Sequence, residues 1–185
     1  MPDPHPSSLT NPLPGPPPDR GGNKGRVGVW FALAAAVVLA DRLSKLAVLA
    51  ALAPGESRPL TGFFNLALVF NKGAAFSFLA GAPGWQTPLL VAIAIAAAAI
   101  VSVLLVRHPQ RRLFAFGLAL ILGGALGNLW DRLAYGYVVD FLDFHAAGWH
   151  WPAFNIADSA ITLGAGTLIA ESFLHHEEAP DAERR

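Results

Sequence analysis

The chain has 185 residues, of which 54% are hydrophobic and 14% are charged, and its mean hydropathy is +0.44. Soluble domains carry about 25% charged residues, so this composition excludes an ordinary water-soluble domain and an intrinsically disordered chain. Equal numbers of basic and acidic residues, 13 of each, give no net field that would attract nucleic acid. The absence of Cys excludes disulfides, thiol nucleophiles and Cys-ligated metals.

The two ends of the chain differ from its middle. Residues 1–25 hold eight prolines within the first 18 positions and no apolar periodicity, which predicts a disordered tail rich in polyproline II conformation. Residues 175–185 are polar and predict a second solvated tail. Residues 26–174 are expected to form one membrane domain.

Four apolar segments occupy this domain. At about 1.5 Å rise per residue, 18 to 20 helical residues cross the ~30 Å hydrocarbon core of a bilayer. The sequence therefore predicts a mainly α-helical membrane protein with four transmembrane helices, at approximately residues 27–52, 88–106, 113–130 and 154–173.

The distribution of Lys and Arg predicts the orientation of these helices. Basic residues flank the start of the first segment and fill the short connection between the second and the third. Because cytoplasmic loops carry an excess of Lys and Arg, both termini are expected in the cytoplasm, and residues 53–87 and 133–153 outside it.

The first outer segment is unusually apolar for a loop. Residues 60–79 are rich in Phe, Val and Leu and include Asn71 and Gly73, a composition typical of short strands around a turn. A small β element is therefore expected at the outer membrane interface.

Polar side chains gather at the outer ends of the predicted helices. A carboxylate in hydrocarbon costs roughly 2.5–3.5 kcal/mol on insertion scales, so each one requires a partner or a function. Asp41 and Lys45 have the i,i+4 spacing and order of an intrahelical ion pair. Asp131 and Arg132 lie at the end of the third predicted helix, and a structural role for this charge pair is favoured over a chemical one.

Glycines in the third segment predict close helix packing. Gly123 and Gly127 form a small-xxx-small pair, which allows another helix to approach. Gly124, Asn128 and Arg132 recur at four-residue intervals and therefore share one helix face.

Asp140 and Asp158 each lack a neighbouring Lys or Arg in the sequence. Held close together in a low-dielectric site, they would share one proton and act as a general acid–base pair on water. Held apart, they would be two independent interfacial carboxylates. Spacing alone leaves both interpretations open.

Five short motifs, in order, resemble those of lipoprotein signal peptidase (signal peptidase II), a family of bacterial membrane aspartic peptidases. The resemblance covers about residues 28–173, and the motifs are DRLSK at 41–45, NKGAAFSF at 71–78, GGALGNLWDR at 123–132, VVDF at 138–141 and FNIADSA at 154–160. It implies four transmembrane helices with a small periplasmic β cradle, in a bacterial cytoplasmic (inner) membrane, with the active site at the periplasmic face.

The resemblance also implies site residues and partners. The implied catalytic dyad is Asp140 and Asp158. The implied substrate-binding or dyad-supporting residues are Asp41, Lys45, Asn71, Gly73, Gly124, Asn128, Arg132, Asn155 and Ala157. The implied substrate is a diacylglyceryl-modified prolipoprotein in the membrane lipid, cut just before its lipidated Cys. Globomycin-like cyclic peptides are the implied inhibitors, no cofactor or metal is implied, and a monomer is expected. A helix N-terminus favours negative charge, so Asp158 is the expected anionic partner.

Other functions compete with this interpretation. A proton-coupled or channel-like protein would use the two acids as relay groups, and a non-catalytic scaffold would use residues 53–87 for binding. A Ser–Lys dyad of Ser77 or Ser159 with Lys45 is also conceivable, although packing or capping suits both serines better. The spacing of Asp143, His145 and His150 is a weak metal-ligand signal, and GGALG lacks the Lys and Ser/Thr of a phosphate-binding loop.

Overall fold

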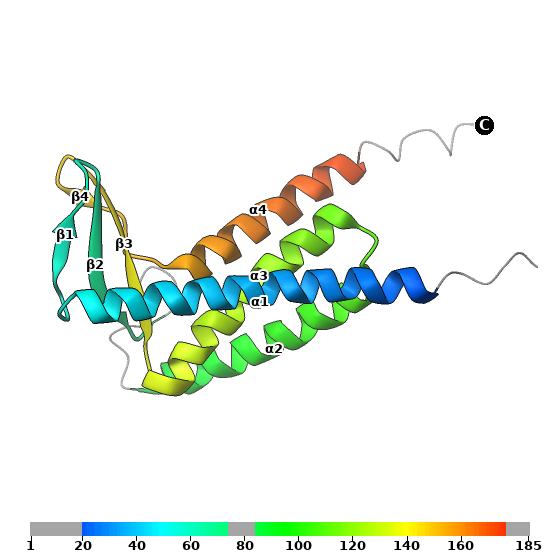
Figure 1. The fold of residues 1–185 in the computed structure, drawn as a ribbon, viewed down its shortest axis with the longest axis horizontal. Coiled ribbons are helices and arrows are strands. Elements are labelled where there is room, and N and C mark those ends of the chain that lie inside the picture. The colour runs from blue at the N-terminus through cyan, green and yellow to red at the C-terminus, as the bar shows by residue number, and fades with distance from the viewer. Residues whose placement is uncertain (1–19, 74–83, 177–185) are drawn as a thin grey trace, which may run out of the picture.

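The computed structural model describes residues 20–73 and 84–176, which form four helices and four short strands (Figure 1). The helices are α1 (Arg20–Ala51), α2 (Gln86–Arg107), α3 (Arg112–Tyr135) and α4 (Ile156–His176). The strands are β1 (Ser57–Pro59), β2 (Phe64–Asn71), β3 (Val138–Ala146) and β4 (Trp149–His150). The mainly helical prediction with a small β element is confirmed.

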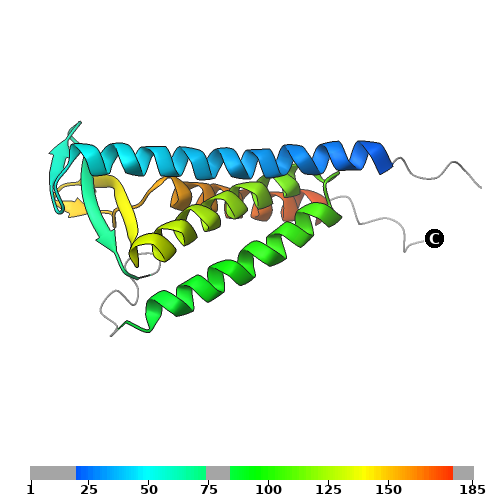
Figure 2. The same ribbon diagram turned by 60° about the horizontal axis from the view of Figure 1, so that its bottom comes forward.

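Helix α3 is the centre of the bundle. It packs against α4, α1 and α2, whereas α1 and α2 barely touch each other (Figures 1 and 2). Three helices of the described chain are long and apolar enough to cross a membrane: Lys24–Ala51, Gln86–Arg107 and Arg112–Tyr135. Large apolar side chains, such as Ile100 and Leu163, are more than half exposed along the helices, as expected where the surrounding solvent is lipid.

The glycines of α3 allow the close packing expected from their spacing. A Cβ on Gly123 would lie 2.7 Å from the Ala34 carbonyl oxygen of α1, and one on Gly124 would lie 2.3 Å from the Ala157 carbonyl oxygen of α4. A Cβ on Gly127 would lie 2.8 Å from Asp41 Oδ2, so the glycine leaves room for this carboxylate. Adjacent glycines thus serve two different neighbours, so α1 and α4 both approach the backbone of α3.

The strands form one antiparallel sheet in the order β1-β2-β3-β4, at one end of the bundle (Figure 1). Strand β2 confirms the strand predicted within residues 60–79; positions 74–83 lie outside the described residues. Residues 133–153, expected as a loop, instead contribute β3 and β4. Strand β3 pairs with β2, about 70 positions earlier in the chain, and β4 pairs with β3.

Two apolar clusters hold these parts together. One lies inside the bundle and includes Leu105, Leu118 and Leu122. The other joins the sheet to the end of α1, with Val48 and Leu52 against Leu68, Val139 and Phe141. The second cluster fixes β3 over the helix ends and so positions its polar residues beside α3 and α4.

Helix α1 begins at Arg20, inside the range predicted as a disordered tail. Extending an existing helix by one residue costs far less than nucleating a new one, so the apolar helix continues into this polar segment. Residues 1–19 of the tail lie outside the described residues. At the other end, α4 reaches His176, and the rest of the polar C-terminal segment is likewise outside them.

We predict that Gly124→Ala destabilises the protein, because the new methyl group would collide with the α4 backbone. Overpacking of this kind costs about 1–3 kcal/mol, and thermal unfolding in detergent measures it as a lower Tm. The matched control is Gly166→Ala in α4, where a Cβ meets no atom within 4 Å. An equal Tm for both variants would contradict the packing argument.

Candidate active site

The N-terminus of α4 is capped by a side chain that also reaches β3. Asn155 accepts a 2.9 Å hydrogen bond from the backbone N–H of Asp158 through its Oδ1, as helix N-caps do. Its Nδ2 donates to Asp140 Oδ1 at 2.7 Å. One fully buried amide therefore holds the start of α4 and the Asp140 carboxylate together.

Asp140 is buried in β3, with a hydrogen bond to each oxygen. Asn71 Nδ2, from the end of β2, donates to Oδ2 at 3.0 Å, opposite the bond from Asn155. Asn71 Oδ1 in turn accepts the Gly73 backbone N–H at 2.8 Å. Upstream, Gly136 ends α3 with a positive φ of 77° and directs the chain into β3.

Asp158 lies in the first turn of α4 and is half-buried. Its Oδ1 accepts a 2.7 Å hydrogen bond from Asn128 Nδ2 of α3. Asn128 Oδ1 accepts from Asn155 Nδ2 at 3.2 Å. The two carboxylates are thereby joined through two amides, in the order Asp140, Asn155, Asn128, Asp158.

Lys45 is completely buried below these amides. Its Nζ lies 2.7 Å from Asp41 Oδ2, 2.8 Å from Asp131 Oδ2 and 3.2 Å from Asn128 Oδ1. The predicted Asp41–Lys45 pair is confirmed, but Lys45 bridges two acids. Its bond to Asn128 Oδ1 also orients the amide, so that the NH2 group faces Asp158.

Each acid bound by Lys45 also holds a backbone segment of the site. Asp41 Oδ1 accepts the Ala157 N–H at 2.9 Å, which ties α1 to the first turn of α4. Asp131 Oδ2 accepts the Val139 N–H at 3.1 Å, next to Asp140 in β3. The Lys45 cluster (Asp41, Lys45 and Asp131) therefore positions both chain segments that carry the candidate dyad.

Arg132 has a different partner from its neighbour Asp131. Its guanidinium donates to the Gly73 carbonyl oxygen at 2.9 Å, and both Asp140 and Asp158 interact with its charge. Gly73 is buried by this contact and follows the strand that carries Asn71. Arg132 thus supplies positive charge beside the two carboxylates and holds the end of β2.

The environment of Asp140 brings its pKa into the neutral range. Burial away from water and the nearby Asp158 charge raise the pKa of Asp140 to about 7, although hydrogen bonds from Asn71 and Asn155 favour ionisation. At this pKa, one proton is available to the two acids near physiological pH. The arrangement is suited to general acid–base chemistry on a bound water.

The eleven residues implied by the resemblance lie in one connected region. The dyad residues meet through Asn128 and Asn155, Gly124 packs on Ala157, and the remaining five hold the elements around them. Every buried side-chain nitrogen or oxygen in the described residues has a hydrogen-bond partner.

A second polar cluster lies elsewhere on the sheet. Asp143 binds His150 Nδ1 at 2.8 Å and Asn65 Nδ2 at 2.8 Å, and Asn65 Oδ1 contacts His145. Asn65 has no signal in the sequence, because its register opposite Asp143 arises only on strand pairing. Within the part of the chain that the structure describes, no three His, Asp or Glu side chains are placed to hold a metal.

A family model for signal peptidase (SPase) II matches residues 33–174. The chain belongs to the signal peptidase II family. Proteins named lipoprotein signal peptidase from Ralstonia nicotianae and Burkholderia vietnamiensis are 58% and 57% identical to it, over 82% and 78% of this chain and 87% of each relative. Signal peptidase II membership makes this chain a protease of lipoprotein processing with membrane helices.

Solved structures agree with the signal peptidase II assignment in fold. A bacterial membrane enzyme determined by the in meso method at 2.3 Å resolution matches with a TM-score of 0.75 and 28% identity, over 85% of this chain and 95% of that one. A second, at 1.9 Å, matches with a TM-score of 0.69 and 29% identity, over 77% and 91%.

We predict that Lys45→Met strongly destabilises this signal peptidase II chain, because Asp41 and Asp131 would remain buried without their cation. Removing one partner of a buried ion pair costs about 3–5 kcal/mol. Thermal unfolding of the purified protein tests this as a large fall in Tm. Lys72→Met, at an exposed position, is the control with the same chemical change. Equal small effects of both changes would contradict the role of Lys45.

Proposed function

We propose that the chain is an aspartic endopeptidase whose dyad is Asp140 and Asp158. The observation that supports this most is the amide bridge, Asn155 to Asn128, between two acids. Neither acid forms an ion pair with a basic side chain of the described residues. A pKa of about 7 for Asp140 supplies the proton that such a dyad needs. The pair then holds one proton and one negative charge.

The proposed assignment makes Asp140 the acid and Asp158 the base. Asp158 lies in the first turn of α4, where the helix dipole favours an anion. It is also the more exposed of the two, so water can reach it. Asp140 is enclosed by β3 and the two asparagines, which suits the group that keeps its proton.

The first step adds water to the scissile carbonyl. Asp158 removes a proton from the water, whose oxygen forms a bond to the carbonyl carbon. Asp140 donates its proton to the carbonyl oxygen, which produces a neutral gem-diol and leaves Asp140 ionised. The Asn128 hydrogen bond keeps the Asp158 carboxylate oriented during this step.

The second step breaks the peptide bond and restores the dyad. Asp158 donates its newly acquired proton to the amide nitrogen, the carbon–nitrogen bond breaks, and Asp140 takes a proton from a gem-diol hydroxyl. The products are a carboxyl terminus and a free amine. The negative charge of the dyad moves between Asp140 and Asp158 during these steps, and the positive charge of Arg132 stabilises it on either acid.

The proposed substrate is a diacylglyceryl-modified prolipoprotein, cut immediately before its lipidated Cys. Family membership supports this substrate class. A lipidated signal peptide is confined to the bilayer. The candidate dyad comes from β3 and from the first turn of α4, and these two elements meet at the end of the bundle next to the sheet (Figure 1). Globomycin-like cyclic peptides are the proposed inhibitors, and a monomer contains the whole proposed site.

We further propose that α4 is the fourth span and that the sheet lies in the periplasm. With 21 residues, α4 extends over ~31 Å, which matches the ~30 Å hydrocarbon core. Its buried Glu171 is neutralised by Arg111 at 2.6 Å. The excess of Lys and Arg at the opposite ends of the helices supports cytoplasmic termini in the inner membrane.

We predict that Asp140→Asn and Asp158→Asn each abolish cleavage of a purified diacylglyceryl prolipoprotein while the protein stays folded. Loss of either dyad member removes a proton transfer that no other group provides. Asp143→Asn, which changes a carboxylate bound to His150 on the sheet, should retain activity. Cleavage by either dyad variant at a rate near that of the unchanged protein would refute the mechanism. Inactivation by EDTA that zinc reverses would also refute it.

The substrate class is tested with the unlipidated precursor. Cleavage of this precursor at the rate of the lipidated one would refute the proposed substrate class.

We predict that kcat/KM falls above about pH 7, because Asp140 acts as an acid and ionises there. Asn71→Ala removes a hydrogen bond that favours the ionised form. The pKa of Asp140 should therefore rise, and the alkaline limb of the profile should move to higher pH. The pH dependence of kcat/KM in both proteins is the measurement. A shift of that limb to lower pH in the variant would assign the acid to another group.

A further inference from the structure

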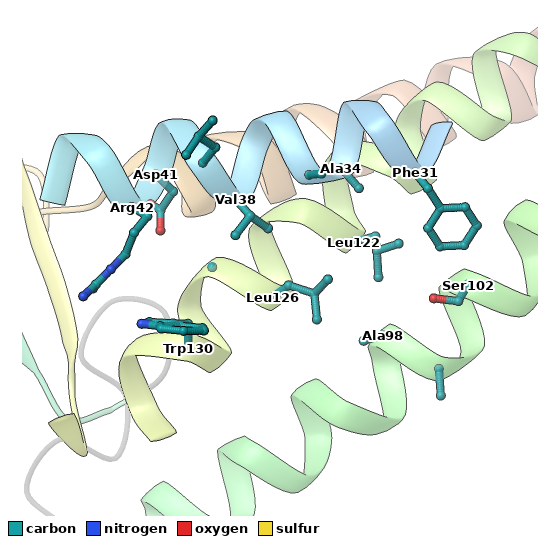
Figure 3. A pocket seen from close by; sticks show the side chains of 14 residues that line it. Phe31, Ala34, Val38, Asp41, Arg42, Ala98, Ser102, Leu122, Leu126 and Trp130 are labelled. Atoms are coloured by element: carbon teal, nitrogen blue, oxygen red, sulfur yellow. The ribbon is translucent and has the colours of Figure 1, made fainter. Parts of the chain in front are cut away.

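A groove lies between α1, α2 and α3 and shares one residue, Asp41, with the Lys45 cluster of the candidate active site (Figure 3). Its volume is about 640 Å³, within the ~300–1,000 Å³ typical of ligand sites. Neither Asp140 nor Asp158 lines it. Its walls are largely apolar and include Ala34 and Val38 of α1, Ala98 and Ala99 of α2, and Leu122 and Leu126 of α3.

The length of the groove along α1 matches the thickness of one leaflet of a bilayer. Its lining runs along α1 from Phe31 to Arg42, which at about 1.5 Å per residue is ~16 Å. This is about half of the ~30 Å hydrocarbon core. A spanning helix of a partner protein would need the full thickness, whereas a lipid acyl chain occupies a single leaflet.

The end of the groove nearest the sheet carries a cation among aromatic rings. The Arg42 guanidinium lies 5.8 Å from the Trp130 ring centroid and 5.3 Å from that of Tyr135. Arg42 also donates to the Tyr135 hydroxyl and, at 3.4 Å, to Asp131. These bonds use part of its five N–H donors, and its side chain is 24% exposed. Arginine beside interfacial Trp and Tyr is suited to a lipid phosphate.

We propose that this groove binds one acyl chain of a glycerophospholipid from the leaflet beside the sheet, with the lipid phosphate at Arg42. The proposal rests on the transmembrane placement given under Proposed function. The bound chain fills the space between α1 and α2, which barely touch each other directly. Phosphate contact distinguishes this lipid from the diacylglyceryl group of a substrate, which carries none.

The acyl-chain part is tested by filling the groove. The full-length protein, purified in a maltoside detergent, is titrated with phosphatidylglycerol, and lipid adducts are measured by native mass spectrometry. Ala99→Phe, which places a ring in the groove, should weaken adduct formation about tenfold or more, because loss of two buried methylenes already has that effect. Ala96→Phe, an exposed position on the same helix outside the groove, should not. Equal adducts in both variants, or dimers in place of adducts, would overturn the proposal.

The headgroup part is tested by removing the cation. Arg42→Gln should weaken binding of phosphatidylglycerol and leave binding of diacylglycerol with the same chains unchanged. Glycerol 3-phosphate at the same concentrations should not compete, since it lacks the chain. Equal binding of both lipids by the unchanged protein, or competition by glycerol 3-phosphate, would overturn the assignment of Arg42 to a lipid phosphate.

This inference and the proposed function fail in different experiments. Cleavage of lipidated substrate with no phosphatidylglycerol adduct would reject the groove and leave the peptidase standing. Selective adducts in a protein without cleavage activity would reject the peptidase and retain the lipid site.

Discussion

The structure depends on a buried lysine. Lys45 neutralises Asp41 and Asp131. Each of these acids holds a backbone N–H next to a residue of the candidate dyad, at Ala157 and at Val139. Burying these charges has a large desolvation cost, which is offset only when every partner is present. The geometry of the site therefore follows from one ammonium group, and α1, α3, α4 and β3 cannot shift independently of it.

The amide bridge built on this cluster sets the chemistry. The side chain of asparagine presents an NH2 donor and a carbonyl acceptor in fixed directions. Its NH2 group can therefore donate to a carboxylate while its oxygen accepts a hydrogen bond from another group. Lys45 fixes Asn128 in this way, and the helix N-cap fixes Asn155. The groups that hydrogen-bond to the two acids through their side chains are thus neutral amides, and Asp140 keeps a pKa of about 7.

Much of the fold could be predicted because its signals are local. Apolar runs indicate the helices, the spacing of Asp41 and Lys45 indicates their ion pair, and Gly123 indicates close packing. Strand β3 could not be predicted in the same way, because its partner β2 is distant in the chain. The second bond of Lys45, to Asp131, likewise arises only from tertiary packing. The motif resemblance was sufficient to name the candidate site residues. The direction of each amide could not be predicted, because it depends on hydrogen bonds between separate elements.

The longest-range contact of the site has a consequence for biogenesis. The Asp41 carboxylate and the Ala157 N–H that it accepts are 116 positions apart, so most of the polypeptide must leave the ribosome before they can meet. Until α4 has been synthesised, Asp41 lacks the N–H of Ala157, and Asp158 is absent from the site. The candidate site therefore cannot assemble during synthesis of α1, α2, α3 and β3, and it forms only after the first turn of α4 has joined them.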